Sequence, residues 1–288
     1  MTAISVSNLS KRYGRTRALD KVNVELQRGE MVALIGASGS GKSTLIRHIA
    51  GLEAGDGADG RIVILDKVSQ AGGKLAGGRR IGRVSVIFQQ FNLVGRLSVL
   101  TNVLIGNLGK VPRWRGTLGI FNRTERNRAL EALARVGIPH VAAQRSSTLS
   151  GGQQQRAAIA RTLVQKAEIL IADEPISALD PSSARRVMDV LADINAQDRI
   201  TVLVSLHQVE YARRYCKRTI AMRDGRIVFD GPSTALSNAF LAELYGDASE
   251  ELVLPDAPAE PAPALPVRKI ARQPVPPVPP VPTVPMHA

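Results

Sequence analysis

The sequence predicts an α/β protein built on a largely parallel sheet, with antiparallel strands at its N-terminal end. After residue 30, short continuous apolar runs alternate with amphipathic helical stretches, as expected for strands buried on both faces by helices. Before residue 30, apolar and polar residues alternate with a period of two, which indicates strands with one exposed face. Aromatic residues make up only 3% of the chain, so the core should consist of Val, Ile, Leu and Ala.

The expected elements follow one another from the N-terminus. Residues 1 to about 30 form antiparallel strands, and MVALIG, from Met31, is a buried strand that a glycine-rich turn joins to a helix. A second strand pair follows, RIVIL from Arg61 and VSVIF from Val84. The chain is then helical from about Ser98 to Val136, apart from a loop-like insert over Pro112 to Asn122. The later strands are EILIADE, ITVLVSL and TIAMRD, with helices such as SSARRVMDVLADIN between them.

The composition indicates the kind of compartment in which this chain works and the kinds of partner that it can have. No stretch approaches the roughly 20 apolar residues of a membrane-spanning helix, and the N-terminus lacks the apolar core of a signal peptide. The single cysteine, Cys216, excludes an internal disulfide, fits a reducing compartment and should be a small buried apolar residue. The net charge of +13 has two open interpretations, a solvated basic surface or proximity to anionic lipid headgroups. The basic residues are scattered, without aromatic interleaving of the kind that stacks nucleic-acid bases, so a nucleic-acid partner is not expected.

The C-terminal residues 247–288 differ in character from the rest. They run through PDAPAEPAPALPV to PVPPVPPVPTVPMHA, and this proline density removes backbone donors and favours extended polyproline II. We therefore expect a disordered tail after residue 246.

A glycine-rich segment after the first buried strand matches the phosphate-binding pattern G-x-x-x-x-G-K-S. A polyphosphate needs several backbone N–H groups converging on it, and glycines let the chain curl that closely beside the positive end of the following helix. Lys42 would reach the β and γ phosphates, and the Ser43 hydroxyl would bind Mg²⁺. The expected nucleotide-binding residues are Gly36, Ala37, Ser38, Gly39, Ser40, Gly41, Lys42, Ser43 and Thr44.

Two acidic residues end the strand that begins at Ile169. Ligands of open α/β sheets lie at the carboxyl ends of the strands, where Asp173 and Glu174 are expected. Asp173 is placed to hold Mg²⁺, and Glu174 to act as general base toward the water that attacks the γ-phosphoryl group. Acidic residues after a strand are often only helix caps, but together with the glycine-rich segment they predict a nucleoside triphosphatase.

The segment LSGGQ, from Leu149 to Gln153, resembles the signature of ABC ATPases and precedes Asp173 by the interval that this family uses. From the local pattern alone, Ser150 is a helix N-cap followed by two flexible glycines. The family resemblance implies instead that the γ-phosphate of a second subunit's ATP would be bound by Ser150, Gly151, Gly152 and Gln153. Other matches occur in family order. The resemblance implies that Tyr13 stacks on adenine, that Gln89 links the Mg²⁺ site to the membrane partner, that Asp180 lies in a loop crossing between subunits, and that His207 contacts the γ-phosphate.

This resemblance implies an ABC-type nucleotide-binding domain over residues 1–246, with a helical subdomain at about 90–160 inserted in a P-loop core. Two copies would sandwich two ATP molecules head to tail, with Mg²⁺ as cofactor. The partners would be a second copy and membrane permease subunits, at the cytoplasmic face of a bacterial inner membrane.

At a finer level, the segments FQQFNLVGRLSVLTNVLIGNLG, LSGGQQQRAAIARTL and LHQVEYARRYC and the W-R insert near Trp114 resemble the ATPases of bacterial phosphonate importers. A periplasmic phosphonate-binding protein would then be an indirect partner, and phosphite or phosphate esters are alternative substrates. The chain departs from the usual pattern at Ala37 and Ile176, neither of which bears a reacting group. A non-transport ABC ATPase, acting on a cytoplasmic phosphonate-degrading complex or on nucleic acid or ribosomes, is the alternative, and copurification with a membrane subunit distinguishes the two.

Overall fold

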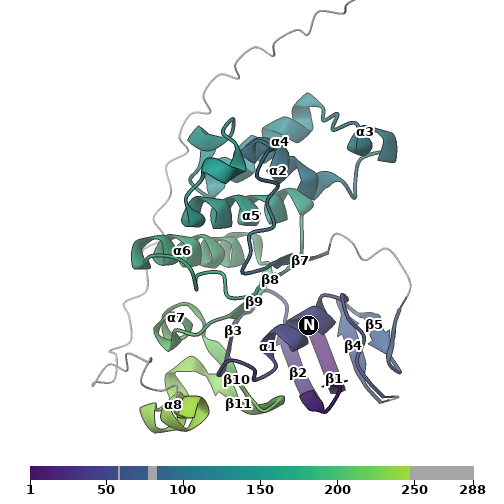
Figure 1. The fold of residues 1–288 in the computed structure, drawn as a ribbon, viewed down its shortest axis with the longest axis vertical. Coiled ribbons are helices and arrows are strands. Elements are labelled where there is room, and N and C mark those ends of the chain that lie inside the picture. Colours follow the sequence, from purple (N-terminus) through teal and green to yellow (C-terminus); the bar gives the residue numbers. More distant parts are fainter. Residues whose placement is uncertain (58, 77–82, 247–288) are drawn as a thin grey trace, which may run out of the picture.

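Two sheets form the centre of the molecule, and a layer of helices covers one face of the larger sheet (Figure 1). The computed structural model describes residues 1–57, 59–76 and 83–246. The predicted tail at residues 247–288 lies outside the described residues.

The first sheet is antiparallel, with strand order β2-β1-β4-β5-β6. Its strands are β1 (Thr2–Tyr13), β2 (Thr16–Gln27), β4 (Arg61–Ile64), β5 (Lys67–Ala71) and β6 (Lys74–Leu75). The antiparallel pairing of β1 with β2 is confirmed. The pairing predicted between the strands at Arg61 and Val84 is wrong, because β4 lies against β1 and β5 in this sheet.

The second sheet is largely parallel, as predicted, with strand order β11-β10-β3-β9-β8-β7. Its strands are β3 (Met31–Ile35), β7 (Val84–Ile87), β8 (Ile169–Ala172), β9 (Thr201–Ser205), β10 (Arg218–Arg223) and β11 (Arg226–Pro232). Only β11, at one edge, runs antiparallel to its neighbour. The carboxyl ends of β3, β8 and β9, neighbours at the centre of the sheet, therefore meet along one edge.

Both faces of the parallel sheet are buried. Along β3, Met31, Ala33 and Ile35 pack into the core beneath the helices, whereas Val32 and Leu34 pack toward helix α1 and the antiparallel sheet. This two-sided burial explains why β3 reads as a continuous apolar run. Cys216 is buried as expected, and burial raises the pKa of its thiol to about 12.

The helices are α1 (Lys42–Ile49), α2 (Val99–Leu104), α3 (Arg113–Thr117), α4 (Arg123–Arg135), α5 (Gly151–Gln165), α6 (Pro181–Asp198), α7 (Val209–Tyr215) and α8 (Asn238–Tyr245). Helices α2, α3, α4 and α5 lie together at one end of the molecule (Figure 1). Among residues 1–57, 59–76 and 83–246, no helix combines the length and apolar character needed to cross a membrane.

The loop-like conformation predicted for Pro112 to Asn122 is wrong in part, because this insert contains helix α3. A hydrogen bond from the Leu118 N–H to the Trp114 carbonyl and an ion pair between Arg115 and Glu125 close it into a compact turn. The ion pair joins residues ten positions apart, which the local sequence pattern did not reveal.

Candidate nucleotide-binding site

The glycine-rich turn lies between β3 and α1, at the carboxyl end of the central strand. Gly36 has φ +146°, and a Cβ there would lie 2.2 Å from the Met222 carbonyl oxygen. Gly41 has φ +104°, and its Cβ would lie 2.5 Å from the Ala18 carbonyl oxygen. Any other residue would therefore clash with backbone at both positions. Ser38 and Gly39 are exposed at the tip of the turn, and Gly41 precedes α1 without a side-chain cap.

Lys42, the first residue of α1, bends back into this turn. Its Nζ donates hydrogen bonds to the carbonyl oxygens of Gly36 at 2.7 Å and Ala37 at 3.0 Å. The side chain is buried, and this burial lowers the pKa of the ammonium against the opposing effect of the Glu174 and Asp173 carboxylates. Among the described residues, the Lys42 Nζ donates hydrogen bonds only to neutral carbonyl groups. A buried cation with such partners is suited to an anionic ligand.

Asp173 follows β8 and faces the start of α1 across the sheet edge. Its Oδ1 accepts hydrogen bonds from the Ser205 hydroxyl at 2.8 Å and from the Ser43 hydroxyl at 3.3 Å. The structure thus brings together Ser43 and Asp173, the two residues predicted from distant motifs to bind Mg²⁺. Hydroxyl and carboxylate oxygens are the hard ligands that Mg²⁺ prefers, and the donor set therefore fits this ion.

Glu174 and His207, predicted as catalytic residues, are also neighbours. Glu174 adopts a left-handed conformation with φ +49°, and its N–H donates to the Ser205 hydroxyl at 2.8 Å. This conformation directs the carboxylate to His207, with 2.6 Å between Glu174 Oε1 and His207 Nε2. Both side chains line a cavity of about 250 Å³ at the carboxyl ends of β8 and β9.

The predicted signature residues lie at the start of α5. The Ser150 hydroxyl accepts a hydrogen bond from the Gln153 N–H at 3.4 Å, and the Gln153 side chain accepts one from the Ser150 N–H at 3.0 Å. This reciprocal capping box confirms that Ser150 is the N-cap of α5, as the local sequence pattern indicated. Gly151 and Gly152 are needed for packing, since a Cβ would lie 3.0 Å from Leu179 and 2.9 Å from Ser183, respectively. Within the described residues, no hydrogen bond joins positions 150–153 to positions 36–44.

Three predicted residues lie at the edges of this site. The Tyr13 hydroxyl donates to Glu53, and burial together with Glu53 raises the pKa of the phenol, against smaller lowering effects of Arg47 and of a hydrogen bond with Thr44. Tyr13 is therefore held beside the first turn of α1, with its ring half exposed. Gln89 is exposed two residues after β7. Asp180 is the N-cap of α6, where hydrogen bonds from Ser183 and Ser182 hold the pKa of its carboxyl well below the usual range.

Sequence reasoning missed Ser205, which joins the two acidic residues. Its single hydroxyl donates to Asp173 and accepts from the Glu174 backbone, so it sets the position of both. Ser205 is the last residue of β9, and polar residues at the carboxyl end of a buried strand are the signal that could have found it.

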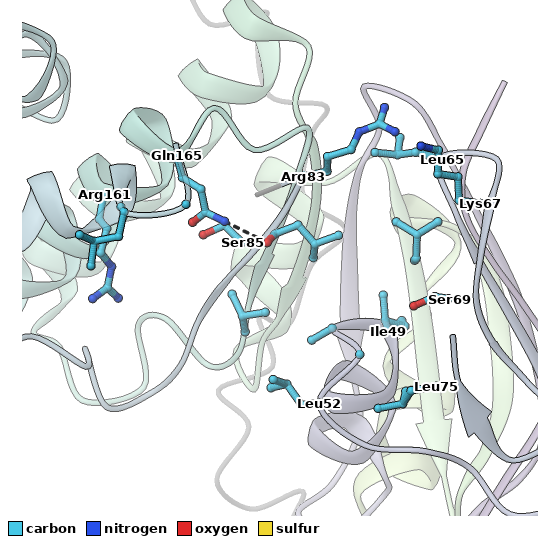
Figure 2. A pocket seen from close by; sticks show the side chains of 18 of the residues that line it. Ile49, Leu52, Leu65, Lys67, Ser69, Leu75, Arg83, Ser85, Arg161 and Gln165 are labelled. Carbon is cyan, nitrogen blue, oxygen red and sulfur yellow. Dashed lines mark hydrogen bonds between the residues drawn. The ribbon is translucent and has the colours of Figure 1, made fainter. Parts of the chain in front are cut away.

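Arg161 was also missed. This residue of α5 donates hydrogen bonds to the carbonyl oxygens of Asn92 at 2.8 Å and Phe91 at 3.5 Å, and thereby holds the loop that follows Gln89. Burial lowers the pKa of its guanidinium group. Figure 2 shows Arg161 and Gln165 on one side of a cavity of about 610 Å³, with Ile49, Leu52 and Leu75 on the other.

A buried parallel strand, a glycine turn that closes around its own lysine, and an acidic pair after a neighbouring strand together define a P-loop nucleotide-binding protein. The chain belongs to the ABC transporter family, whose model matches residues 19–177. It is accordingly an ATP-binding cassette, a class that works with a second cassette and with membrane subunits.

The chain is similar over most of its length to curated relatives. It is 61% identical over 246 residues to "Phosphonates import ATP-binding protein PhnC 1" of Pseudomonas aeruginosa, with 84% of this chain and 88% of the relative covered. It is 58% identical to "Phosphonates import ATP-binding protein PhnC" of Stutzerimonas stutzeri, with 88% and 94% covered.

Solved structures share the fold. A dimeric ATP-binding cassette in a post-hydrolysis state, bound to ADP and Pi, has a TM-score of 0.67 and 31% identity, and covers 80% of this chain and 98% of its own. The cassette cbiO1 of Clostridium perfringens has a TM-score of 0.70 and 28% identity, with 84% and 93% covered. The expected ABC-type fold is thereby confirmed.

Proposed function

We propose that this chain hydrolyses ATP to drive a phosphonate importer. The observation that supports phosphonate as the transported substrate is the 61% identity, over 84% of the chain, to a relative named for phosphonate import. The chemistry is supported by the hydrogen-bonded series Ser43, Asp173, Ser205, Glu174 and His207, which links residues from α1, β8 and β9 at one sheet edge.

Hydrolysis would proceed with ATP on the glycine-rich turn. Lys42 would exchange its hydrogen bonds to Gly36 and Ala37 for the β and γ phosphates. Ser43, Asp173 and Gln89 would hold Mg²⁺, which when bound neutralises charge on the phosphate oxygens. Glu174 would take a proton from the attacking water, and His207, hydrogen-bonded to that carboxylate, would fix its orientation and contact the γ-phosphate.

The second half of each site would come from a second copy. Ser150, Gly151, Gly152 and Gln153 would face the γ-phosphate across the dimer interface, with the positive end of α5 directed toward it. Asp180 would lie in the loop that crosses between the two copies. In this arrangement an isolated chain hydrolyses ATP slowly.

Residues 1–246 would form the ATPase domain, with a helical subdomain at about 90–160, and residues 247–288 a tail. The domain would bind permease subunits at the cytoplasmic face of the bacterial inner membrane, and a periplasmic phosphonate-binding protein would act on it indirectly. Gln89 would connect the Mg²⁺ site to the permease.

The Glu174→Gln variant tests the ATPase and its dimer. We expect the variant to bind ATP, with hydrolysis reduced by about 10²–10⁴-fold. We also expect a dimer in the presence of ATP and Mg²⁺ when mass is measured by light scattering after gel filtration. Monomeric elution under these conditions would contradict the model.

The substrate requires a second experiment. Vesicles containing the chain, its permease and the binding protein are supplied with phosphonate, phosphite or a phosphate ester, and ATPase activity is measured. Stimulation by phosphonates is expected; stimulation by phosphite alone would contradict the substrate but leave the ATPase intact.

A further inference from the structure

The insert between α2 and α4 presents an unusual number of large apolar side chains to solvent. Leu108, Trp114, Leu118 and Ile120 are 41%, 62%, 66% and 47% exposed, respectively. Trp114 is the only tryptophan of the chain. Exposing a tryptophan beside three aliphatic residues is unfavourable in water, so such a cluster indicates a surface that is covered when the protein works.

This apolar cluster, which we call the α3 patch, is surrounded by positive charge. The exposed residues Lys110, Arg113, Arg123, Arg126 and Arg128 lie in and next to it along the chain. The only acidic residue between positions 108 and 128 is Glu125, which is buried and paired with Arg115. The Lys110 Nζ donates to the Gln165 carbonyl oxygen at 2.8 Å, and partial burial of this group, together with the charges of Lys166 and Arg128, lowers the pKa of its ammonium.

The patch is held in place by a polar framework beneath it. Glu125 accepts from the Arg115 guanidinium group at 2.7 Å and from the Asn122 N–H at 2.7 Å, and the Asn122 side chain accepts from the Glu125 N–H in return. A Cβ on Gly116 would lie 3.1 Å from the Leu108 side chain, so α3 packs closely on the preceding segment. The apolar side chains are therefore displayed on an anchored helix turn, and do not merely follow a loose loop.

Trp114, Leu118 and Ile120 also do not line the neighbouring cavity of about 610 Å³, although Leu108 and Lys110 do. Helix α3, which carries Trp114 and is followed by Leu118 and Ile120, lies at one end of the molecule (Figure 1). A protein partner would have to meet this basic rim with acidic residues of its own, because the polar rim of a protein interface is complementary in charge to its partner. A single tryptophan with aliphatic neighbours inside a rim of one sign instead matches the boundary of an anionic bilayer, where tryptophan lies at headgroup level and basic residues bind lipid phosphates.

We propose that the α3 patch binds the headgroup region of an anionic membrane directly. Trp114, Leu118 and Ile120 enter the boundary between headgroups and acyl chains, and Arg113 and Arg123 bind lipid phosphates. The chain thus has a lipid contact of its own in addition to any contact through a membrane subunit. This proposal does not depend on which substrate is transported, and the basic rim accounts for part of the +13 net charge.

The single tryptophan provides a direct probe. The full-length protein is titrated with vesicles of phosphatidylethanolamine and phosphatidylglycerol, and with vesicles of phosphatidylcholine alone, while Trp114 emission and flotation with the vesicles are measured. We expect a blue shift and flotation with the anionic vesicles only, both weakened by added salt. Flotation without a blue shift would mean binding through another surface and would overturn the proposal.

Two double variants keep Trp114 and separate the contribution of the basic residues to membrane binding from that of the apolar residues. Arg113→Gln with Arg123→Gln removes two charges and should weaken binding by about 30-fold. Leu118→Ser with Ile120→Ser should abolish the blue shift. A matched control, Arg214→Gln with Lys217→Gln, removes the same charge from exposed positions on and just after α7 and should leave the blue shift unchanged.

Folding is monitored by thermal unfolding and basal ATPase activity, which these surface variants should retain. Equal weakening by the control pair would mean nonspecific charge attraction and would contradict the proposal. A blue shift that requires purified permease in detergent, and is absent with anionic vesicles, would assign the patch to a protein partner and would likewise overturn it.

Discussion

The glycine-rich turn and the signature segment handle the same phosphate in the family, yet they are organised in opposite ways in this chain. Around the turn, Ser43 of α1, Asp173 after β8 and Ser205 of β9 are joined by hydrogen bonds over long sequence distances, and Lys42 bonds to the carbonyl groups of the turn itself. At the signature, the side chains of Ser150 and Gln153 bond to each other's backbone N–H groups and cap their own helix.

In the dimer that we propose, this difference separates the half of the site that folding assembles from the half that a second copy would complete. The turn region is complete once β3, β8 and β9 lie side by side. At the signature, Ser150 is exposed at the start of α5, where in the proposed dimer a second copy would supply the phosphate. Within the chain the signature packs on α6, where Ser183 lies against Gly152.

The largest expected effect comes from the turn region. Lys42→Ala removes a buried cation, and we expect ATPase activity to fall by about 10²–10³-fold together with a loss of nucleotide affinity. Steady-state hydrolysis and binding of a fluorescent ATP analogue measure the two quantities. The exposed Lys74 offers a control, since Lys74→Ala removes the same charge and should change neither.

A smaller effect is expected at Ser205. Ser205→Ala leaves the Glu174 N–H and part of the Asp173 carboxylate without partners, a loss of about 1–3 kcal/mol. The free energy of unfolding should decrease by that amount in urea denaturation, and kcat should fall by about 10-fold. Unchanged kcat in a destabilised protein would show that Ser205 supports only the fold.

The smallest effect on stability is expected at Ser150. The Ser150 variant also tests most directly the comparison between the glycine-rich turn and the signature segment. Ser150→Ala should cost about 1 kcal/mol through loss of the α5 cap. Ser237 caps α8 in the same way, through a hydrogen bond from the Phe240 N–H, and Ser237→Ala should cost a similar amount. Only the Ser150 variant should also reduce ATPase activity, by about 10-fold, while the monomer retains its affinity for ATP. Equal ATPase activity in the two variants would make Ser150 a structural cap alone.

Much of the fold and of the candidate site was predictable from local pattern. The apolar run at Met31, the glycine turn and the helix from Lys42 form a contiguous unit whose geometry depends on neighbouring residues. Gly36 and Gly41 were expected to be essential, and the structure adds the reason, namely the carbonyl groups of Met222 and Ala18 behind them. The meeting of Ser43 with Asp173 followed from the rule that strand carboxyl ends share an edge.

What the sequence determined by itself was the order of strands and helices, the glycine turn with its lysine, and the acidic pair after a buried strand. These depend on periodicity and on residue types within a few positions. Only the tertiary structure decided that β4 and β7 join different sheets, that Ser205 bridges Asp173 and Glu174, and that Arg115 and Glu125 shape the insert carrying Trp114. Those features depend on contacts between residues distant in the chain, where many partners compete and only the packed core selects one.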